Sequence, residues 1–178
     1  PAPLTPVETL LLSPRGAVGV TPDGRWLFDT HHADHPQARR WGKDNGISVG
    51  FSSQYAAMRA RFGAHMADGC AAENLVVASD EPWGLDDLAG GLFVRQRDGA
   101  LAVLAMPLVA TPCVPFARFA AGDQALGGTA MRDALRFLNH GRRGFYLRLV
   151  EPLPVATVRP GDPVYLARRA VGGGGASS

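Results

Sequence analysis

A continuous apolar run, residues 100–110, ends in the sequence Thr-Pro-Cys-Val-Pro at residues 111–115. Because proline lacks a backbone N–H and fixes φ, strands end where it appears. We therefore expect Cys113 at the mouth of a strand, on a stiff turn, where a thiolate can meet a ligand in a pocket. The alternative is a buried cysteine that only fills space, as free cysteines commonly do.

Short apolar segments bounded by turn residues recur along the chain. They predict strands at 7–13, 17–20, 25–28, 75–77, 92–95, 100–110, 145–150, 155–158 and 163–167. Apolar side chains at helical spacing predict helices at 53–66 and 129–139, and a short helical turn at 116–119. Many short strands with two helices predict a mainly β (α+β) fold, a barrel on which the helices pack.

The chain of 178 residues is long enough for one sizeable core, and we expect a single domain over residues 1–170. Residues 171–178 are rich in Gly and Ser and predict a flexible tail. The net charge of +2, from 18 basic and 16 acidic residues, gives no electrostatic support for nucleic-acid binding. No apolar run reaches the length that crosses a bilayer, so we expect no membrane partner.

Two cysteines, Cys70 and Cys113, are too few for a disulfide framework. We expect both to be reduced thiols, although one bridge between them is the open alternative. The sequence begins without the charged and apolar pattern of a signal peptide. Together these features predict a cytoplasmic protein.

A polar segment at 29–45 carries His31, His32 and His35 together with nearby aspartates. A histidine and carboxylate cluster of this kind suggests a metal site, but the spacing matches no standard zinc pattern. We interpret the segment as a hydrophilic loop.

Four segments, taken in order, resemble the MOSC domain, the module named from the C-terminal part of molybdenum cofactor sulfurase. Residues 73–77 resemble the family's Glu-Asn-Leu strand start, and Pro112-Cys113 resembles its Pro-Cys pair. Residues 143–150 resemble its Arg-Gly-aromatic strand, and residues 158–166 its closing Gly-Asp-x-Val-x-Leu strand. The resemblance covers the chain from about Ser13 to Leu166.

This resemblance implies a β-barrel and a role in molybdenum or sulfur chemistry. It implies that Cys113 is the catalytic residue, as the ligand of a metal or the carrier of sulfur. The implied cofactor is the molybdenum cofactor, molybdopterin. Family members with demonstrated activity reduce N-hydroxylated compounds with electrons from a partner protein, so the implied partners are a small-molecule substrate or sulfur donor and an electron-transfer protein.

Two arginines are candidates for holding this cofactor. Molybdenum bound by a dithiolene accepts a further soft thiolate, and nearby cations favour the thiolate form. Arg142 and Arg143, with His140, are candidates for that positive field, and either arginine suits the phosphate of the cofactor. The alternative is that both arginines solvate a helix end, where cations are favoured in any case.

Three polar residues complete the predicted cofactor site. Asn74 can bond the pterin edge, and Glu73 can accept from a pterin N–H or a metal-bound water. Thr111 can bond an oxyanion or sulfur. The alternative for Glu73 and Asn74 is a turn that satisfies backbone groups at a strand start.

Different functional classes remain open. One is a molybdenum-dependent reductase of N-hydroxylated compounds, and another is a non-catalytic module that carries persulfide on Cys113 or delivers cofactor. A cysteine hydrolase using Cys113 with His140 or His65 lacks a supporting motif around the cysteine. We do not expect pyridoxal phosphate, because the only lysine, Lys43, lies in a polar loop.

Overall fold

The computed structural model describes residues 4–36, 38, 46–150 and 152–167. The predicted tail and Lys43 lie outside these residues. The elements are β1 (Thr9–Ser13), β2 (Gly16–Val20), β3 (Trp26–Phe28), β4 (Ile47–Phe51), α1 (Ser52–Phe62), β5 (Leu75–Val77), β6 (Leu92–Arg95), β7 (Leu101–Val109), α2 (Val114–Ala121), α3 (Gly128–Leu138), β8 (Phe145–Val150), β9 (Ala156–Val158) and β10 (Val164–Leu166).

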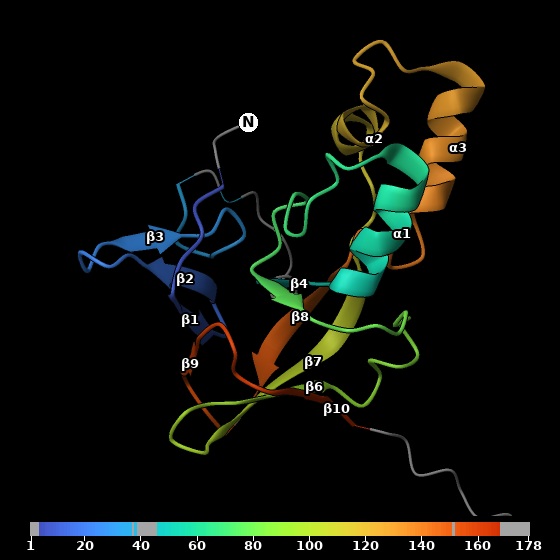
Figure 1. The fold of residues 1–178 in the computed structure, drawn as a ribbon. Helices are drawn as coiled ribbons and strands as arrows, with labels where there is room; N and C mark the ends of the chain where they lie inside the picture. The colour runs from blue at the N-terminus through green and yellow to red at the C-terminus, as the bar shows by residue number, and fades with distance from the viewer. Residues whose placement is uncertain (1–3, 37, 39–45, 151, 168–178) are drawn as a thin grey trace, which may run out of the picture.

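The strands form two sheets around one core (Figure 1). The larger sheet has the order β10-β6-β7-β8-β4-β5 and curls into a nearly closed barrel, and the smaller has the order β3-β2-β1-β9. Apolar side chains from both sheets meet in the core, where Leu12, Ile47 and Leu104 are fully buried. The fold is therefore mainly β with helices added, as the sequence predicts.

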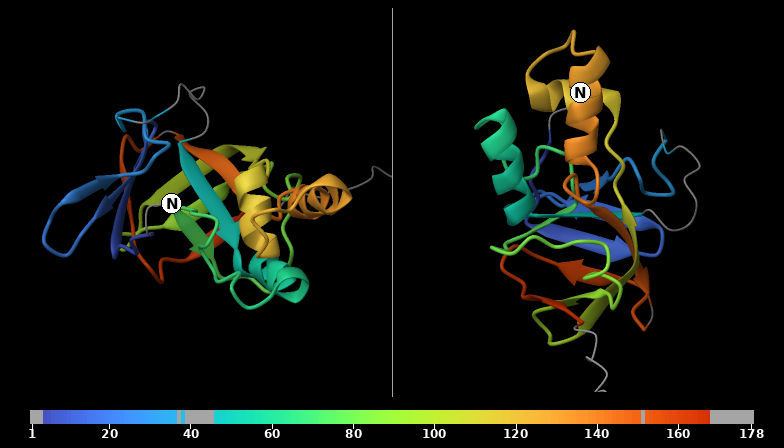
Figure 2. Two further views of the ribbon diagram at one scale, coloured as in Figure 1. Left: turned by 90° about the horizontal axis from the view of Figure 1, so that it is seen from above. Right: turned by 90° about the vertical axis from the view of Figure 1, so that its right-hand side faces the viewer.

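The three helices gather at one end of the barrel, as both views in Figure 2 show. They share a second apolar cluster that includes Tyr55, Met58, Ala117 and Leu138. None of the helices among the described residues is long and apolar enough to cross a membrane.

Strand β8 separates a core face from a polar face. Burial alternates along it, with Phe145, Leu147 and Leu149 fully buried and the residues between them half-buried. This pattern follows from the period-2 geometry of a strand. It sets Phe145 in the core and leaves Tyr146 on the polar face, next to Ser48 in register on β4.

Most predicted elements are confirmed, but some boundaries are wrong. The first helix ends at Phe62 rather than at 66, because Gly63 leaves the helical conformation with φ 112°. The predicted turn at 116–119 is a complete helix, α2. Strand β4 was not predicted.

Strand β7 continues through Pro107 by means of a β-bulge. The register with β8 shifts between Ala105 and Leu108, and Met106 adopts a positive φ of 57°. Because one strand carries an extra residue here, β7 bends and the ladder is locally broken. The strand ends at Val109, so Cys113 lies beyond it, at the start of α2.

The barrel remains open along one seam. Strands β5 and β10 are the two edges of the larger sheet. A cleft of about 730 Å³ lies along this seam and is lined by residues of both edges, among them Val77, Val164 and Leu166, with Trp83 at its side.

Candidate functional site

Asn74, which immediately precedes β5, joins the start of β5 to β4. Its Oδ1 accepts from the backbone N–H of Ser48 at 2.8 Å and from the Ser48 hydroxyl at 3.1 Å. In return, the Asn74 backbone N–H donates to Ser48 Oγ at 2.9 Å. The Asn74 oxygen therefore satisfies backbone at the strand start, which is the alternative role that the sequence allows for it.

Glu73 is held in a tight internal position. Its Oε2 accepts a hydrogen bond from the Tyr55 hydroxyl. The Tyr55 oxygen in turn accepts a hydrogen bond from the Ala71 backbone N–H at 3.2 Å. Its Oε1 faces Gly50, where a Cβ would lie only 3.0 Å away. Burial raises the pKa of Glu73, and the Tyr55 hydrogen bond and the charge of Arg143 oppose this rise. Glu73 thus links β5, α1 and Arg143.

Arg143 connects Glu73 to the first turn of α2. Its guanidinium lies over the Phe116 ring at 5.2 Å, and its Nη1 donates to the Tyr146 hydroxyl at 3.4 Å. Its Nε is buried without a hydrogen-bond partner among the described residues. A buried donor left unpaired costs about 1–3 kcal/mol. Arg143 therefore has unused capacity to bind an acceptor.

His31 and Asp29 extend the row of polar side chains formed by Glu73, Arg143 and Tyr146, and we call these residues together the polar line. His31 Nε2 lies 3.5 Å from the Tyr146 hydroxyl, and His31 Nδ1 lies 2.9 Å from Asp29 Oδ1. Burial acts to raise the pKa of Asp29, but hydrogen bonds from the His31 ring and backbone outweigh it, so the pKa lies below its ordinary value. The carboxylate of Asp29 fixes the orientation of the imidazole, an arrangement typical of proton-transferring histidines.

Cys113 caps the first turn of α2. It is exposed, has an extended backbone, and its carbonyl accepts the Ala117 N–H at 2.9 Å. The segment before it is joined to the turn that carries Arg143, because the Ala110 N–H donates to the Gly144 carbonyl at 3.0 Å. Arg143 packs on the same helical turn that Cys113 caps. A helix N-terminus favours negative charge, which suits a thiolate.

The other predicted residues lie around this centre. Thr111 is exposed between β7 and Cys113. Arg142 is exposed as well, and it donates from Nη1 to the Phe137 carbonyl at 2.7 Å with its guanidinium over the Phe137 ring at 4.5 Å. Arg142 therefore stabilises the end of α3, whereas Arg143 belongs to the polar line.

Strained backbone occurs near two residues of this site, Glu73 and Arg143, and within β7. Among the described residues, positive φ outside glycine occurs at Ala72, Met106 and His140. Ala72 immediately precedes Glu73, His140 lies in the turn before Arg143, and Met106 forms the bulge of β7. Such conformations cost about 1–3 kcal/mol each and concentrate at functional sites.

The sequence alone did not indicate several members of this group. Asp29 and His31 looked like parts of a hydrophilic loop, and Tyr55 like helix packing. His31 lies 115 positions from Tyr146 in the chain, so only the tertiary fold joins them. Within the described ranges, no group of three or more His, Cys, Asp or Glu side chains is arranged to hold a metal ion.

The fold, a mainly β barrel with helices packed at one end, is shared with solved structures. The crystal structure of YiiM from Escherichia coli matches with a TM-score of 0.55 and 15% identity, covering 95% of this chain and 67% of that one. YiiM from Geobacillus stearothermophilus matches with a TM-score of 0.50 and 19% identity, covering 93% and 76%. A hypothetical protein matches at 0.57 and 12%, covering 93% and 64%.

The chain thus spans about two thirds of the length of the first and last of these structures. At these identities, the likeness establishes a shared fold. No protein-family model matches the chain, and neither does any curated protein.

Proposed function

We propose that this chain is a MOSC-type protein that binds the molybdenum cofactor through Cys113 and Arg143 and reduces N-hydroxylated compounds. The observation that carries the proposal is the packing of Arg143 on the helical turn capped by Cys113. That packing places the half-buried Arg143, whose buried Nε has no partner within the described chain, on the helix that begins directly after the exposed Cys113. The MOSC-like fold supports the proposal.

The residues present fit such a cofactor. Cys113 offers an accessible soft sulfur, the ligand type that molybdenum accepts beside a dithiolene. Arg143 offers an unsatisfied donor for a phosphate or ring oxygen, and Thr111 adds an exposed hydroxyl two residues before Cys113. Glu73 positions Arg143 by its charge. Asn74 acts mainly by fixing the strand that carries Glu73.

The cofactor would supply a two-electron redox centre. Reduction of a hydroxylamine consumes two electrons and two protons and yields an amine and water. The electrons come from a redox partner protein, as in the reductases that the sequence resembles. The chain's own contribution is the line from Asp29 through His31 to the Tyr146 hydroxyl, which can hold a proton at His31 Nε2 and pass it toward the departing oxygen.

The test is the molybdenum and pterin content of protein purified from a host that makes the cofactor. We expect stoichiometric molybdenum with fluorescent pterin in the natural sequence, loss of both in Cys113→Ser, and strong depletion in Arg143→Gln. Arg142→Gln is the matched control, because Arg142 caps α3, and it should retain both. Molybdenum absent from the natural sequence, or equally present in Cys113→Ser, would contradict the proposal.

A second function is favoured by the exposure of the Cys113 thiol. Cys113 could accept sulfur from a donor persulfide, so that the donor leaves as a thiol and Cys113 becomes a persulfide. Mass spectrometry after incubation with such a donor should show one added sulfur atom on Cys113 and none on Cys70. A protein that takes up sulfur there but holds no molybdenum would be a carrier.

A further inference from the structure

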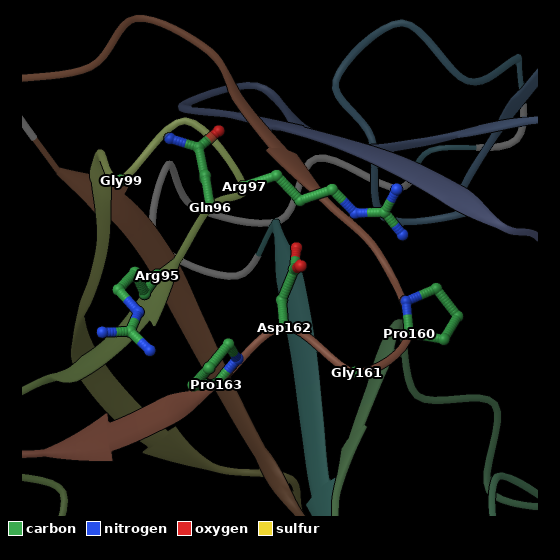
Figure 3. A pocket seen from close by; sticks show the side chains of 8 residues that line it. All are labelled: Arg95, Gln96, Arg97, Gly99, Pro160, Gly161, Asp162 and Pro163. Carbon is green, nitrogen blue, oxygen red and sulfur yellow. The ribbon is translucent and has the colours of Figure 1, made fainter.

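A second cleft lies at the opposite end of β7 from Cys113. It has a volume of about 560 Å³ and is lined by two turns, residues 95–99 between β6 and β7 and residues 160–163 between β9 and β10 (Figure 3). Strand β7 has nine residues, so it separates the two regions by roughly 30 Å. The cleft is therefore distinct from the Cys113 site.

A buried amide forms part of the cleft wall. Gln96 is only 9% exposed, and its Oε1 accepts the Thr157 backbone N–H at 2.5 Å. This bond fixes the orientation of the amide and ties β9 to the β6–β7 turn. The two turns that line the cleft are thus held in fixed relative positions.

Two arginines from the same turn add positive charge. Arg95 and Arg97 are both exposed, and neither forms a salt bridge with any described residue. Arg95 lies over the Tyr165 ring at 5.7 Å, and its backbone N–H donates to the Pro163 carbonyl at 2.9 Å. The ring contact restrains the Arg95 side chain, and the backbone hydrogen bond joins the two turns that line the cleft. Guanidinium groups suit the oxygens of phosphate and carboxylate.

One carboxylate lies between the arginines. Figure 3 shows the Asp162 carboxylate with the Arg97 guanidinium on one side and the Arg95 guanidinium on the other. Asp162 Oδ2 accepts the Arg159 backbone N–H at 2.8 Å, which holds the carboxylate in place. A carboxylate has further acceptor sites, so Asp162 can also accept from a ligand hydroxyl. The cleft thus combines donors for an anion with an acceptor for a hydroxyl.

From this combination we infer that the cleft binds a small hydroxylated oxyanion. The anionic group, a phosphate or a carboxylate, receives hydrogen bonds from the Arg97 guanidinium, and Arg95 adds positive charge on the other side of Asp162. A hydroxyl of the same molecule donates to Asp162. The volume lies within the range of small-molecule sites. The inference is independent of the function proposed for Cys113.

Calorimetric titration tests this inference with glycerol 3-phosphate, glycerate, inorganic phosphate and glycerol as probes. We expect saturable binding of glycerol 3-phosphate or glycerate, and the tighter of the two identifies the anionic group. Glycerol should not bind. Arg97→Gln should weaken binding about tenfold or more, since charged hydrogen bonds contribute about 1.5–3 kcal/mol. Asp162→Asn, which can still accept from Arg159, should weaken the hydroxylated probe more than inorganic phosphate.

Arg132→Gln is the matched control, because Arg132 is an exposed arginine of α3 remote from the cleft. Thermal unfolding of each variant reports whether its fold is retained, which is expected because the substituted side chains are solvent-accessible. Absence of saturable binding for both hydroxylated probes would overturn the inference. Equal weakening in Arg132→Gln would overturn it as well, because binding would then follow total charge alone.

Discussion

Arg142 and Arg143 are adjacent in sequence, but their guanidinium groups stack on different rings. Arg142 lies over Phe137 of α3, and Arg143 lies over Phe116 of α2. The backbone turn between α3 and β8 therefore places the Arg142 guanidinium at the end of α3. It places the Arg143 guanidinium on the first turn of α2, which follows Cys113. Their separate positions allow each arginine to serve as the control for the other.

The two arginines should affect the Cys113 thiol differently. Arg143→Gln removes the cation that packs on the first turn of α2, so an anionic disulfide reagent will be attracted less strongly to that turn. We expect its reaction rate with Cys113 to fall about threefold or more. Arg142→Gln should change this rate little. Stopped-flow absorbance measures both rates, and equal rates in the two variants would refute the assignment of Arg143.

The two cysteines should differ strongly in reactivity. Burial, followed by the charge of Glu73, raises the pKa of Cys70 to about 11, whereas Cys113 is exposed. At pH 8 only roughly 0.1% of Cys70 is thiolate, and the thiolate is the reactive form. We expect one rapidly reacting thiol in the native protein and a second, Cys70, that reacts much more slowly until the protein is unfolded. Peptide mapping that locates the rapid label on Cys70 would contradict this expectation.

Gly144 should not tolerate a side chain. Its φ is 98°, and a Cβ would lie 2.5 Å from the Val49 carbonyl oxygen. Gly144→Ala should lower the free energy of unfolding by about 2–4 kcal/mol, through backbone strain and this collision. Gly24→Ala is the matched control, because Gly24 has φ 81° and open space around it. It should cost about 1 kcal/mol. Urea unfolding measures the free energy of unfolding of both variants. Similar decreases in the two would show that small structural shifts remove the collision at little cost in free energy.

Glu73 should make stability depend on pH. Because burial raises the pKa of Glu73 above its ordinary value of 4.5, the folded protein binds this proton more tightly than the unfolded chain does. The free energy of unfolding contributed by Glu73 therefore falls as pH rises from about 4.5 through the folded-state pKa. Glu73→Gln does not titrate. The difference in unfolding free energy, natural sequence minus variant, should decrease between about pH 4 and pH 7. A constant or rising difference would refute the raised pKa.

Local sequence patterns predict most of the strands and two of the helices, because period-2 and helical spacing are properties of short segments. Strand β4 was not predicted because Gly50 interrupts its apolar run, and Gly46 and a long polar segment precede it. The sequence patterns predict too short a length for α2, the helix that begins after Cys113. Proline near a helix start is a known signal, and Pro115 provides it here.

The candidate site is less predictable than the fold. The resemblance led to Cys113, Glu73 and Arg143, and the structure links the last two by charge. The role of Asn74 in binding Ser48 depends on the parallel pairing of β4 with β5, which is not a local property. The contact of His31 with Tyr146 likewise depends on tertiary packing.

Because the barrel is open along one seam, the edge strand β5 beside the site can open locally without unfolding of the whole protein. Strand β5 has three residues and a single partner strand in the larger sheet, so its amide hydrogens should exchange with solvent before those of β7 and β8. The residues that lead into β5 are Glu73 and Asn74. Each opening of this edge therefore loosens the support of Arg143, and a molecule bound beside Cys113 would slow exchange at an edge that it does not touch.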